Sequence, residues 1–478
     1  MAQKIDQQTR QDIKPDICVI GAGPGGLAAA SAAAAFGVNV VLIEKGKMGG
    51  ESLNCGSVPS KALLAAAAQA HTSRNGVMGA RFGVDFATAR DHVRAVVAAI
   101  APQDSRERLN GLGVRVLQGE GRFTDPTTVA VNGFDVKARR FVIAAGSSPA
   151  VPAIPGLADT PYLTNETVFD LAVCPRHLIV VGADSPGLEL AQAFRRFGAE
   201  VTVLEAAVPL ASDDPECAAI VLDGLAREGV ALRSGVEIVQ VRRSLSRVQV
   251  DIVTGALKET IEGTHILIAT GRRPNLENLD LDLAGIRYNR NGIVIDRRLH
   301  TSNKQVYAIG DVTDGPRFTH LAHHHAGLVI RHALFRTPVR ADRLTVPWVT
   351  YTDPELAQVG LIEGEARAHY GVIRILRSPY RENDRALATG KTNGHIKIIT
   401  DRRGDILGAT IVGAGAAENI AAWALAINQK LNIDAIAGVI LPYPTYAEVG
   451  KRAAMTYFTR GLTSPLVRRI IGGLRRFG

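Results

Sequence analysis

The stretch Asp16-Ile-Cys-Val-Ile-Gly21-Ala-Gly23-Pro-Gly-Gly26 decides how this chain folds. Four apolar residues predict a buried strand, and the glycines that follow predict a tight turn opening a helix. Residues 27–36 are rich in Ala, which favours a helix. Residues 38–43 are rich in β-branched residues and predict a second strand that ends at Glu44. Strand, glycine turn, helix, strand and terminal acid together form a βαβ unit that binds a dinucleotide.

The same sequence pattern occurs a second time, in His177-Leu-Ile-Val-Val-Gly182-Ala-Asp184-Ser-Pro-Gly187. It is followed by a predicted helix and by Val201-Thr-Val-Leu-Glu205. The acid follows the first glycine by 23 residues in both copies, from 21 to 44 and from 182 to 205. A single glycine fingerprint is a weak signal, but two copies in one register, each with its acid, are a strong one. The chain therefore predicts two dinucleotide-binding domains.

Three further apolar strands end in glycine, which lets a loop approach a nucleotide closely. They are Phe141-Val-Ile-Ala-Ala-Gly146, His265-Ile-Leu-Ile-Ala-Thr-Gly271-Arg-Arg-Pro and Val306-Tyr-Ala-Ile-Gly310-Asp311. From about residue 346 the pattern changes to strands at 395–399 and 406–412, followed by an Ala-rich helix. This last part predicts a third domain of the α+β kind.

The composition is that of a globular protein. With 478 residues, 46% of them hydrophobic and 21% charged, the chain is neither disordered nor collagen-like, and its length favours two or three domains. Its net charge of +9 attracts anions without indicating nucleic acid, which we do not expect as a partner. Its four cysteines (Cys18, Cys55, Cys174 and Cys217) contain no C-x-x-C pair, so neither structural zinc nor a disulfide-stapled secreted fold is predicted.

The ends of the chain bear on its location. Residues 1–14 are polar and lack the apolar core of a signal peptide, and residues 25–43 are better explained as a helix, a turn and a strand than as a membrane span. We therefore expect a cytoplasmic protein. Residues 464–478, SPLVRRIIGGLRRFG, form a basic amphipathic stretch. It suits either contact with an anionic membrane surface or packing on its own protein, and the second interpretation is favoured.

These motifs resemble the pyridine nucleotide–disulfide oxidoreductases, such as dihydrolipoamide dehydrogenase, glutathione reductase and mercuric reductase. The resemblance also includes Gly49-Gly-Glu-Ser-Leu-Asn-Cys-Gly-Ser-Val-Pro-Ser-Lys61 and Thr352-Asp-Pro-Glu355, and it spans nearly the whole chain. Mercuric-reductase-like members look most similar, because Leu441-Pro-Tyr443-Pro-Thr-Tyr-Ala-Glu448 carries Tyr where dihydrolipoamide dehydrogenase has His.

The resemblance implies an α/β fold with two Rossmann-like dinucleotide-binding domains, one for FAD and one for NAD(P)H, plus a C-terminal α+β dimerisation domain. We expect the FAD-binding domain at residues 1–150 and 276–345, the NAD(P)-binding domain at 151–275, and the dimerisation domain with its basic tail at 346–478. A homodimer follows from the resemblance alone.

The first fingerprint has every residue that a dinucleotide needs. Gly21 makes the turn, Gly23 lets the pyrophosphate approach, Gly26 packs the helix on the strand, and Glu44 accepts a bond from a ribose hydroxyl. By resemblance, Asp311 bonds the sugar chain of the flavin. The other cofactor-binding residues that the resemblance implies are Gly25, Lys45, Gly50, Ser52, Lys61, Gly121, Ala145, Gly146 and Ala322 for FAD, and Gly182, Gly187, Glu205 and Gly271 for NAD(P)H.

The resemblance also implies a pair beside the flavin. Lys61 is expected near the flavin N5, with Glu189 paired to it. Without the surrounding motifs, two unrelated solvated charges would be the preferred interpretation of these residues.

The first departure from the family lies where two cysteines form its redox disulfide. Here the positions hold Ser52 and Ser57, and a hydroxyl takes no part in thiol exchange. Cys55 lies between them, and a buried inert thiol is favoured over a reactive one. Whether the serines are natural or introduced stays open.

The second departure is Asp184, which replaces the middle glycine of the second fingerprint. A carboxylate about 4 Å from a phosphate charge costs roughly 1 kcal/mol in water and about 4 kcal/mol at an effective dielectric of 20. NAD(P)H binding is thus expected to be weakened by roughly ten- to a thousandfold. Glu205 favours NADH over NADPH, since a 2′-phosphate would meet its carboxylate.

The third departure is the family's His–Glu base, replaced by Tyr443 with Glu448. A phenol with a pKa near 10 is a poor base at neutral pH, so Tyr443 is either a hydrogen-bond donor or an aromatic packed at the dimer interface. Four histidines, His320, His323, His324 and His325, invite a metal site. Because neighbouring positions of a helix point in different directions, no metal site is expected there.

These observations predict an enzyme that takes hydride from NAD(P)H onto FAD and passes electrons directly to a small acceptor such as a quinone or oxygen. Its candidate catalytic residues are Ser52, Ser57, Lys61, Glu189, Tyr443 and Glu448. Two alternatives stay open. One is a flavin-binding pseudoenzyme or binding partner, and the other is a Cys-to-Ser variant of a mercuric-reductase-like or dithiol reductase.

Overall fold

A computed structural model describes residues 10–75, 85–244, 247–341, 345–462 and 465–476. The chain divides into two compact units. Unit 1 comprises residues 1–175, 242–248 and 265–342, and unit 2 comprises residues 176–241, 249–264 and 343–478.

Unit 1 is built on a five-stranded parallel sheet in the order β20-β8-β2-β3-β4. These strands are short apolar runs, which suits a parallel sheet covered on both faces. In the register, Ile17 of β2 lies between Val40 of β3 and Arg140 of β8. The strands are β2 (Ile17–Ile20), β3 (Val40–Glu44), β4 (Val114–Gln118), β8 (Arg140–Ile143) and β20 (Val306–Ala308).

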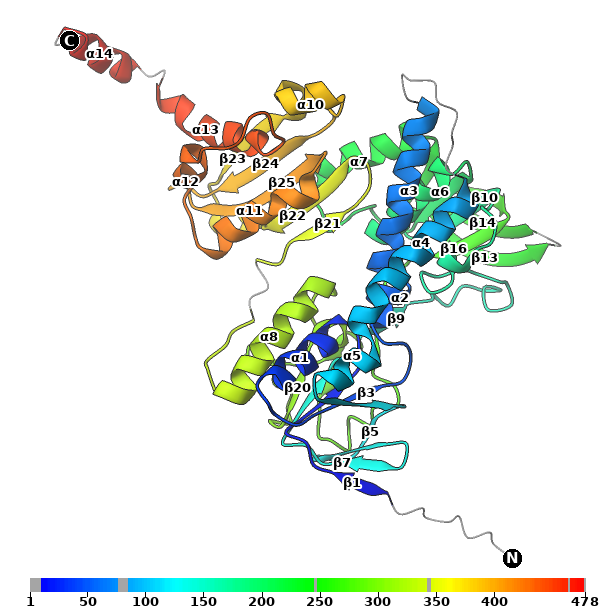
Figure 1. Cartoon of the computed structure of the whole chain (residues 1–478). Coiled ribbons are helices and arrows are strands. Elements are labelled where there is room, and N and C mark those ends of the chain that lie inside the picture. The colour runs from blue at the N-terminus through cyan, green and yellow to red at the C-terminus, as the bar shows by residue number, and fades with distance from the viewer. Residues whose placement is uncertain (1–9, 76–84, 245–246, 342–344, 463–464, 477–478) are drawn as a thin grey trace, which may run out of the picture. The chain divides into compact units, whose positions relative to one another are not determined.

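Two helices cover one face of this sheet, and a smaller sheet lies on the other. Helices α1 (Pro24–Ala35) and α8 (Thr319–Phe335) pack side by side through small residues such as Ala29 and Ala326 (Figure 1). The second face buries Phe123 and Phe141 in an edge-to-face contact, their ring centroids 5.4 Å apart. The small sheet has the order β1-β7-β6-β5, with β1 (Gln11–Ile13), β5 (Arg122–Asp125), β6 (Thr128–Val131) and β7 (Phe134–Val136).

The remaining elements of unit 1 include two short antiparallel strand pairs. Strand β9 (Ser147–Pro149) pairs with β17 (Arg272–Pro274), and β18 (Tyr288–Asn289) pairs with β19 (Gly292–Ile293). The others are α2 (Gly50–Asn54), α3 (Ser57–Asn75), α4 (Phe86–Ile100), η1 (Ala101–Asp104), α5 (Arg106–Gly111), η2 (Val168–Asp170) and η3 (Gly310–Val312).

Unit 2 begins with the second βαβ pattern. Strands β10 (His177–Val181), β11 (Glu200–Glu205) and β12 (Val230–Ser234) are parallel, and α6 (Ser185–Arg196) and α7 (Pro215–Arg227) connect them. Strand β16 (His265–Ile268) is hydrogen-bonded in the sheet order β12-β11-β10-β16. Asp214 caps α7 by accepting from the backbone N–H groups of Glu216 and Cys217. The chain continues with β13 (Glu237–Ser244), β14 (Arg247–Thr254) and β15 (Leu257–Gly263).

Unit 2 ends with an antiparallel sheet in the order β21-β22-β25-β24-β23. Its core packs Trp423 and Tyr380 against the sheet, and a Cβ on Gly450 would lie 2.9 Å from the Trp423 ring. The strands are β21 (Trp348–Thr350), β22 (Glu355–Gly360), β23 (Arg374–Pro379), β24 (His395–Thr400) and β25 (Ile406–Gly413). The helices are α9 (Glu363–Tyr370), η4 (Tyr380–Glu382), α10 (Asp384–Thr389), α11 (Ala416–Asn428), α12 (Ile433–Gly438), α13 (Glu448–Leu462) and α14 (Pro465–Leu474).

The predicted elements around both fingerprints are confirmed. The apolar stretch 25–43 divides into α1 and β3, as expected, and the predicted strands at 395–399 and 406–412 are β24 and β25. Within the described parts of the chain, no helix combines the length and apolar character needed to cross a membrane. The expected domain boundaries stay predictions, and the expected NAD(P) and dimerisation domains lie mostly within unit 2.

Candidate functional site

The first fingerprint forms a turn that only glycine fits. Gly21 has a φ of +106°, and a Cβ there would collide with the carbonyl oxygen of Ala144. A Cβ on Gly26 would collide with the carbonyl oxygen of Gly21, so the start of α1 lies directly against the turn. At both positions the backbone leaves no room for a side chain, and their roles in holding a dinucleotide stay predictions.

Gly23 borders an open space at the N-terminus of α1. Its backbone is extended, with φ −76° and ψ −178°, and a Cβ there would meet no atom within 4 Å. Gly50 closes in from α2, since its own Cβ would lie 2.7 Å from the Cα of Gly23. Because a helix N-terminus attracts anions, this space fits a pyrophosphate.

Glu44 lies at the end of β3, beside this space. Its Oε2 accepts from the backbone N–H of Ala22 at 2.5 Å, and its Oε1 accepts from that of Gly46 at 2.6 Å. The two bonds hold the carboxylate at the edge where a dinucleotide presents its ribose. The first site therefore fits a dinucleotide by backbone geometry and by its acid.

The second fingerprint has the same hydrogen-bond frame as the first. Gly182 has a φ of +108°, against +106° for Gly21, and each of the two terminal acids accepts from two backbone N–H groups. The corresponding N–H to O pairs are Gly21–Ile43 and Gly182–Leu204 (both 2.8 Å), Ala22–Glu44 (2.5 Å) and Ala183–Glu205 (2.8 Å), and Gly46–Glu44 (2.6 Å) and Ala207–Glu205 (2.8 Å).

Asp184 stands in this second frame where Gly23 stands in the first. Its φ of −81° and ψ of 174° match the backbone of Gly23, so its Cβ enters the space that is open in the first site. The side chain is exposed at the mouth of the site, yet partial desolvation there, followed by the charge of Glu205, raises the pKa of its carboxyl.

A second acid lies near Asp184. Asp213 is 5% exposed, and burial raises the pKa of its carboxyl to about 6, although the hydrogen bond from Trp348 Nε1 at 2.8 Å favours its ionised form. The charges of Asp184 and Asp214 also raise the pKa of Asp213. The start of α6 is thus surrounded by carboxylates, which a pyrophosphate does not favour.

Ser147 joins the carboxylate of Asp311 to an arginine in unit 1. Its Oγ donates to Asp311 Oδ2 and accepts from Arg272 Nε, both at 2.7 Å. Arg272 Nε also lies 3.9 Å from Asp311 Oδ2. The sequence motif contained Arg272, but its spacing did not indicate this contact.

Glu51 extends the same network toward Cys55. Glu51 Oε1 lies 3.2 Å from Arg272 Nη1 and accepts from Asn165 Nδ2 at 3.0 Å. Asn165 also donates to the backbone carbonyl of Cys55 at 3.0 Å. Burial raises the pKa of Glu51, whereas Arg272 lowers it. Sequence reasoning missed Glu51 and Asn165, whose only signal was the position of Glu51 beside Ser52.

Ser52 and Ser57, which flank Cys55 along the chain, differ in exposure. Ser52 is buried, and its Oγ lies 3.4 Å from Thr319 Oγ1, whereas Ser57 is exposed at the start of α3. Cys55 is partly buried, and burial, followed by the charge of Glu51, raises the pKa of its thiol to about 12. At neutral pH this thiol is protonated, which favours the inert interpretation.

Lys61 and Glu189 belong to different units, and their expected pairing stays a prediction. Lys61 Nζ lies 3.4 Å from Ser60 Oγ on α3. Glu189 is 2% exposed, and its Oε1 accepts from the backbone N–H of Tyr351 at 2.8 Å.

Tyr443 is exposed and bonded to an acid that the sequence did not indicate. Its OH donates to Asp384 Oδ2 at 2.7 Å, and this hydrogen bond raises the pKa of the phenol. Glu448 Oε2 accepts from the backbone N–H of Thr445 at 3.3 Å. The phenol is therefore a hydrogen-bonded donor and an even poorer base than free tyrosine.

Most of the other residues predicted to hold FAD lie in unit 1 around the carboxyl ends of β2, β3 and β8. Close approach explains two glycines: a Cβ on Gly25 would lie 3.1 Å from that of Ala322, and one on Gly121 would lie 3.2 Å from Ile43. The carbonyl of Ala145 accepts from Asn275 Nδ2 at 2.8 Å. Gly146 and Gly271 have φ of +69° and +107° and border open space.

Two remaining predicted residues differ in their surroundings. Lys45 pairs with Glu120 at 3.6 Å on the surface, and Gly187 is buried near the start of α6. Their expected roles in cofactor binding stay predictions.

The histidines on α8 do not converge. His325 is 6% exposed, His323 and His324 are exposed, and His320 stacks on Phe318. Among the described residues, no group of three or more His, Cys, Asp and Glu side chains is arranged to hold a metal ion.

The chain belongs to the pyridine nucleotide-disulphide oxidoreductase family: the family's main model matches residues 15–326 and its dimerisation-domain model matches residues 346–454. A mercuric reductase of Lysinibacillus sphaericus is 34% identical over 92% of this chain and 82% of its own length. A dihydrolipoyl dehydrogenase of Geobacillus stearothermophilus is 33% identical over 92% of this chain and 96% of its own length.

Solved structures agree with this assignment. The HOCl-induced flavoprotein disulfide reductase RclA of Escherichia coli, in a Cu(II) complex, has a TM-score of 0.85 and 27% identity, covering 93% of this chain and 99% of that one. LpdA of Mycobacterium tuberculosis has a TM-score of 0.85 and 26% identity, covering 94% and 99%. The predicted family and α/β fold class, with its C-terminal dimerisation domain, are confirmed.

Proposed function

We propose that this protein is an FAD-dependent NAD(P)H oxidoreductase that passes electrons from the flavin directly to a small acceptor such as a quinone or oxygen. One observation carries the proposal. The dinucleotide cradle at Gly21, Gly23 and Glu44 has the geometry that FAD needs, while the positions of the family's redox disulfide hold Ser52 and Ser57. Because a serine pair cannot undergo thiol–disulfide exchange, the flavin is the last electron carrier within the protein in this proposal.

In this proposal, different residues of unit 1 bind different parts of FAD. The open N-terminus of α1 stabilises the pyrophosphate, Glu44 receives a ribose hydroxyl, and Asp311, held by Ser147, receives the sugar chain of the flavin. When bound, FAD supplies a carrier that accepts hydride from NAD(P)H and returns two electrons to an acceptor. Lys61 orients the flavin in this proposal, and Glu189 pairs with Lys61.

The domain at residues 346–478 makes a homodimer in this proposal, supported by the match of residues 346–454 to the family's dimerisation domain. Tyr443 has one O–H, which it donates to Asp384, so in this proposal it donates to the acceptor only after exchanging that hydrogen bond. A quinone accepts two electrons and two protons to become a quinol, and a hydrogen bond to its carbonyl oxygen favours that reduction. Glu205 favours NADH over NADPH.

An anaerobic titration of the purified protein tests the proposal. NADH, then NADPH, is added while flavin absorbance near 450 nm is followed. Bleaching, followed by reoxidation with a soluble quinone, supports it. Flavin that stays oxidised with both nucleotides at every pH tested, yet is reduced by dithionite, overturns it in favour of a flavin-binding pseudoenzyme.

The alternative of a serine-substituted thiol or metal-ion reductase has its own test. The variant Ser52→Cys with Ser57→Cys restores the family's pair, and two-electron reduction should then give a long-wavelength thiolate–flavin charge-transfer band. A restored thiol-dependent turnover exceeding quinone turnover would favour this alternative, whereas unchanged quinone turnover without disulfide chemistry would favour direct transfer.

We also propose that α14 contacts an anionic membrane surface. Successive helix residues turn by about 100°, which places Ile470, Ile471 and Leu474 on one face and Arg468 with Arg469 on the opposite one. These apolar residues are 53%, 50% and 65% exposed. A short helix with an exposed apolar face and a basic face is typical of contact with anionic lipid, where lipid-soluble quinones also reside.

The membrane proposal predicts co-sedimentation of the full chain with phosphatidylglycerol vesicles and not with phosphatidylcholine vesicles. Exchange of Ile470 and Ile471 for Ser should abolish it, whereas exchange of the exposed Arg402 and Arg403 for Gln should leave most of it. Equal sedimentation of the serine variant and the unchanged protein would exclude α14 as the contact. Residues 464, 477 and 478 of the basic stretch lie outside the described residues.

A further inference from the structure

The second fingerprint has Asp184, a carboxylate, where the first has Gly23, and it has Ser185-Pro186 where the first has Pro24-Gly25. The two sites have the same backbone hydrogen bonds. Gly182 matches Gly21, and Glu205 matches Glu44. In this shared hydrogen-bond frame, Gly23 leaves open space and Asp184 extends a carboxyl group into it. The pyrophosphate of a dinucleotide, which the first cradle accepts, therefore meets an acid in the second.

The charges around Asp184 come from every element that faces it. Glu205 lies at the end of β11, its oxygens bonded to Ala183 and Ala207, and its charge opposes a second charge on Asp184. Asp213 and Asp214 precede α7. Asp213 accepts from Trp348 of β21, and Asp214 is paired with Lys397 of β24 at 2.8 Å, so that ammonium is already engaged.

We propose that Asp184 is the specificity-determining residue of the second site: ionised it repels the pyrophosphate of NAD(P)H, and protonated it admits the pyrophosphate and donates a hydrogen bond to it. This inference rests on the proposed function, because it concerns the electron donor of that reaction. Binding then takes up one proton, which moves from solvent to Asp184 as the pyrophosphate enters. A neutral carboxyl has one O–H to donate, whereas an ionised one only accepts.

Two features indicate that protonation of Asp184 can restore dinucleotide binding, so that the site is not blocked permanently. The backbone at Asp184 is unstrained and keeps the cradle of Gly182 and Ala183 intact, so the site is shaped for a dinucleotide apart from this charge. Partial desolvation, and then the charge of Glu205, raise the pKa of Asp184 and so make its neutral form easier to reach. The ligand class is thus a dinucleotide bound under acidic conditions.

Calorimetric binding of ADP-ribose to the FAD-loaded protein tests this inference without any flavin reduction. ADP-ribose carries the pyrophosphate and no nicotinamide, and adenosine, which lacks phosphate, is the matched ligand. At pH 8 the variant Asp184→Gly should bind ADP-ribose roughly ten- to a thousandfold more tightly than the unchanged protein. Adenosine binding should be equal in the two proteins.

The pH dependence identifies the group. For the unchanged protein, ADP-ribose affinity should fall up to tenfold per pH unit above the pKa of Asp184, with one proton taken up when buffers of different ionisation enthalpy are compared. Asp184→Gly and Asp184→Asn should both lose most of this dependence, and Asn keeps the side-chain size in case Gly disturbs the turn. Asp213→Asn should keep most of it.

Three results would overturn the inference. One is equal ADP-ribose affinity of the unchanged protein and both Asp184 variants at pH 8. Another is a pH dependence that disappears in Asp213→Asn and persists in Asp184→Asn. The third is an Asp184→Gly protein that retains FAD but binds neither ADP-ribose nor NADH at any pH, which would overturn the proposed function as well. The first two leave the proposed function standing.

Discussion

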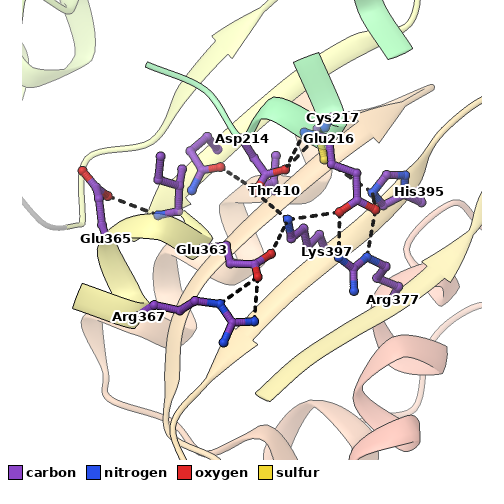
Figure 2. A network of polar contacts seen from close by, with 12 residues as sticks. Asp214, Glu216, Cys217, Glu363, Glu365, Arg367, Arg377, His395, Lys397 and Thr410 are labelled. Atoms are coloured by element: carbon purple, nitrogen blue, oxygen red, sulfur yellow. Dashed lines mark hydrogen bonds and ion pairs between the residues drawn. The ribbon is translucent and has the colours of Figure 1, made fainter. Parts of the chain in front are cut away.

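The ammonium of Lys397 lies 2.8 Å from Oδ2 of Asp214, and the two side chains are 3% and 0% exposed. Asp214 caps α7 with its other oxygen, so this pair joins the second nucleotide-binding segment to strand β24 within unit 2 (Figure 2). Lys397 Nζ also lies 3.1 Å from Glu216 and 2.8 Å from Glu363. Although burial alone would lower it, these hydrogen bonds raise the pKa of Lys397.

Replacing Lys397 by Met should destabilise the protein by about 3–5 kcal/mol, because it leaves the buried carboxylate of Asp214 uncompensated. Urea unfolding followed by circular dichroism measures the change. Lys304→Met is the matched control, since Lys304 pairs with Asp296 on the surface and its loss should change stability by less than about 1 kcal/mol. Equal effects in the two variants would show that the buried pair does not stabilise unit 2.

Acidification toward pH 2 should weaken the ion-pair network around Lys397. The hydrogen bond from Arg377, and then that from Lys397, lowers the pKa of Glu216 from its ordinary 4.5 to about 2, and Lys397 and Arg367 lower that of Glu363. Because the folded pKa lies below the unfolded one, the stabilisation is complete above about pH 4.5 and is lost as pH falls toward 2.

The unfolding free energy should therefore decline between pH 4.5 and 2, and Glu216→Gln should make that decline shallower. Thermal melts across this range measure the effect at constant ionic strength. A decline as steep in Glu216→Gln as in the unchanged protein would assign the acid sensitivity to other carboxylates.

Alanine at two glycines of the first fingerprint should separate folding from cofactor binding. A Cβ on Gly26 collides with the backbone of Gly21, so Gly26→Ala should lower stability by about 1–3 kcal/mol. Gly23→Ala meets no atom within 4 Å, so the protein should fold normally yet retain FAD at least tenfold less well. Flavin content after dialysis, beside the melting temperature, measures both.

Gly327→Ala on α8 is the control for these variants, because a Cβ there also meets no atom within 4 Å and lies away from the fingerprint. It should change neither flavin content nor stability by much, and the better helix propensity of Ala favours the fold. Normal flavin retention in Gly23→Ala would place the pyrophosphate elsewhere.

Removing the charge of Glu51 should raise the midpoint potential of the bound flavin. Glu51 lies 3.2 Å from Arg272, which reaches Asp311 through Ser147, so Glu51→Gln leaves more positive charge beside the reduced flavin. Redox titration with indicator dyes measures the shift. Asp12→Asn, which breaks a surface ion pair with Lys137, should leave the potential unchanged. A potential that is equal in both variants would remove Glu51 from the flavin environment.

Both fingerprints could be predicted from the sequence because their structure depends on residues that are close together along the chain. A positive φ at Gly21 and Gly182, the strand before each and the acid 23 residues later are set by neighbouring residues along the chain. The serines at positions 52 and 57 and the acid at position 184 could likewise be located from the printed sequence alone. The equal backbone angles of Gly23 and Asp184, which locate that acid in the second cradle, required the structure.

The amino-acid sequence by itself determined the two βαβ cradles, the α+β character of the C-terminal domain and the presence of serine at positions 52 and 57, because these depend on residue type and short spacing. Only the tertiary structure decided that Glu51 meets Arg272, that Tyr443 meets Asp384 and that Lys397 meets Asp214. These partners are 221, 59 and 183 residues apart, and no periodicity reports a contact of that range. Such contacts form only where the folded chain brings two charges, or a donor and an acceptor, together from distant parts of the sequence.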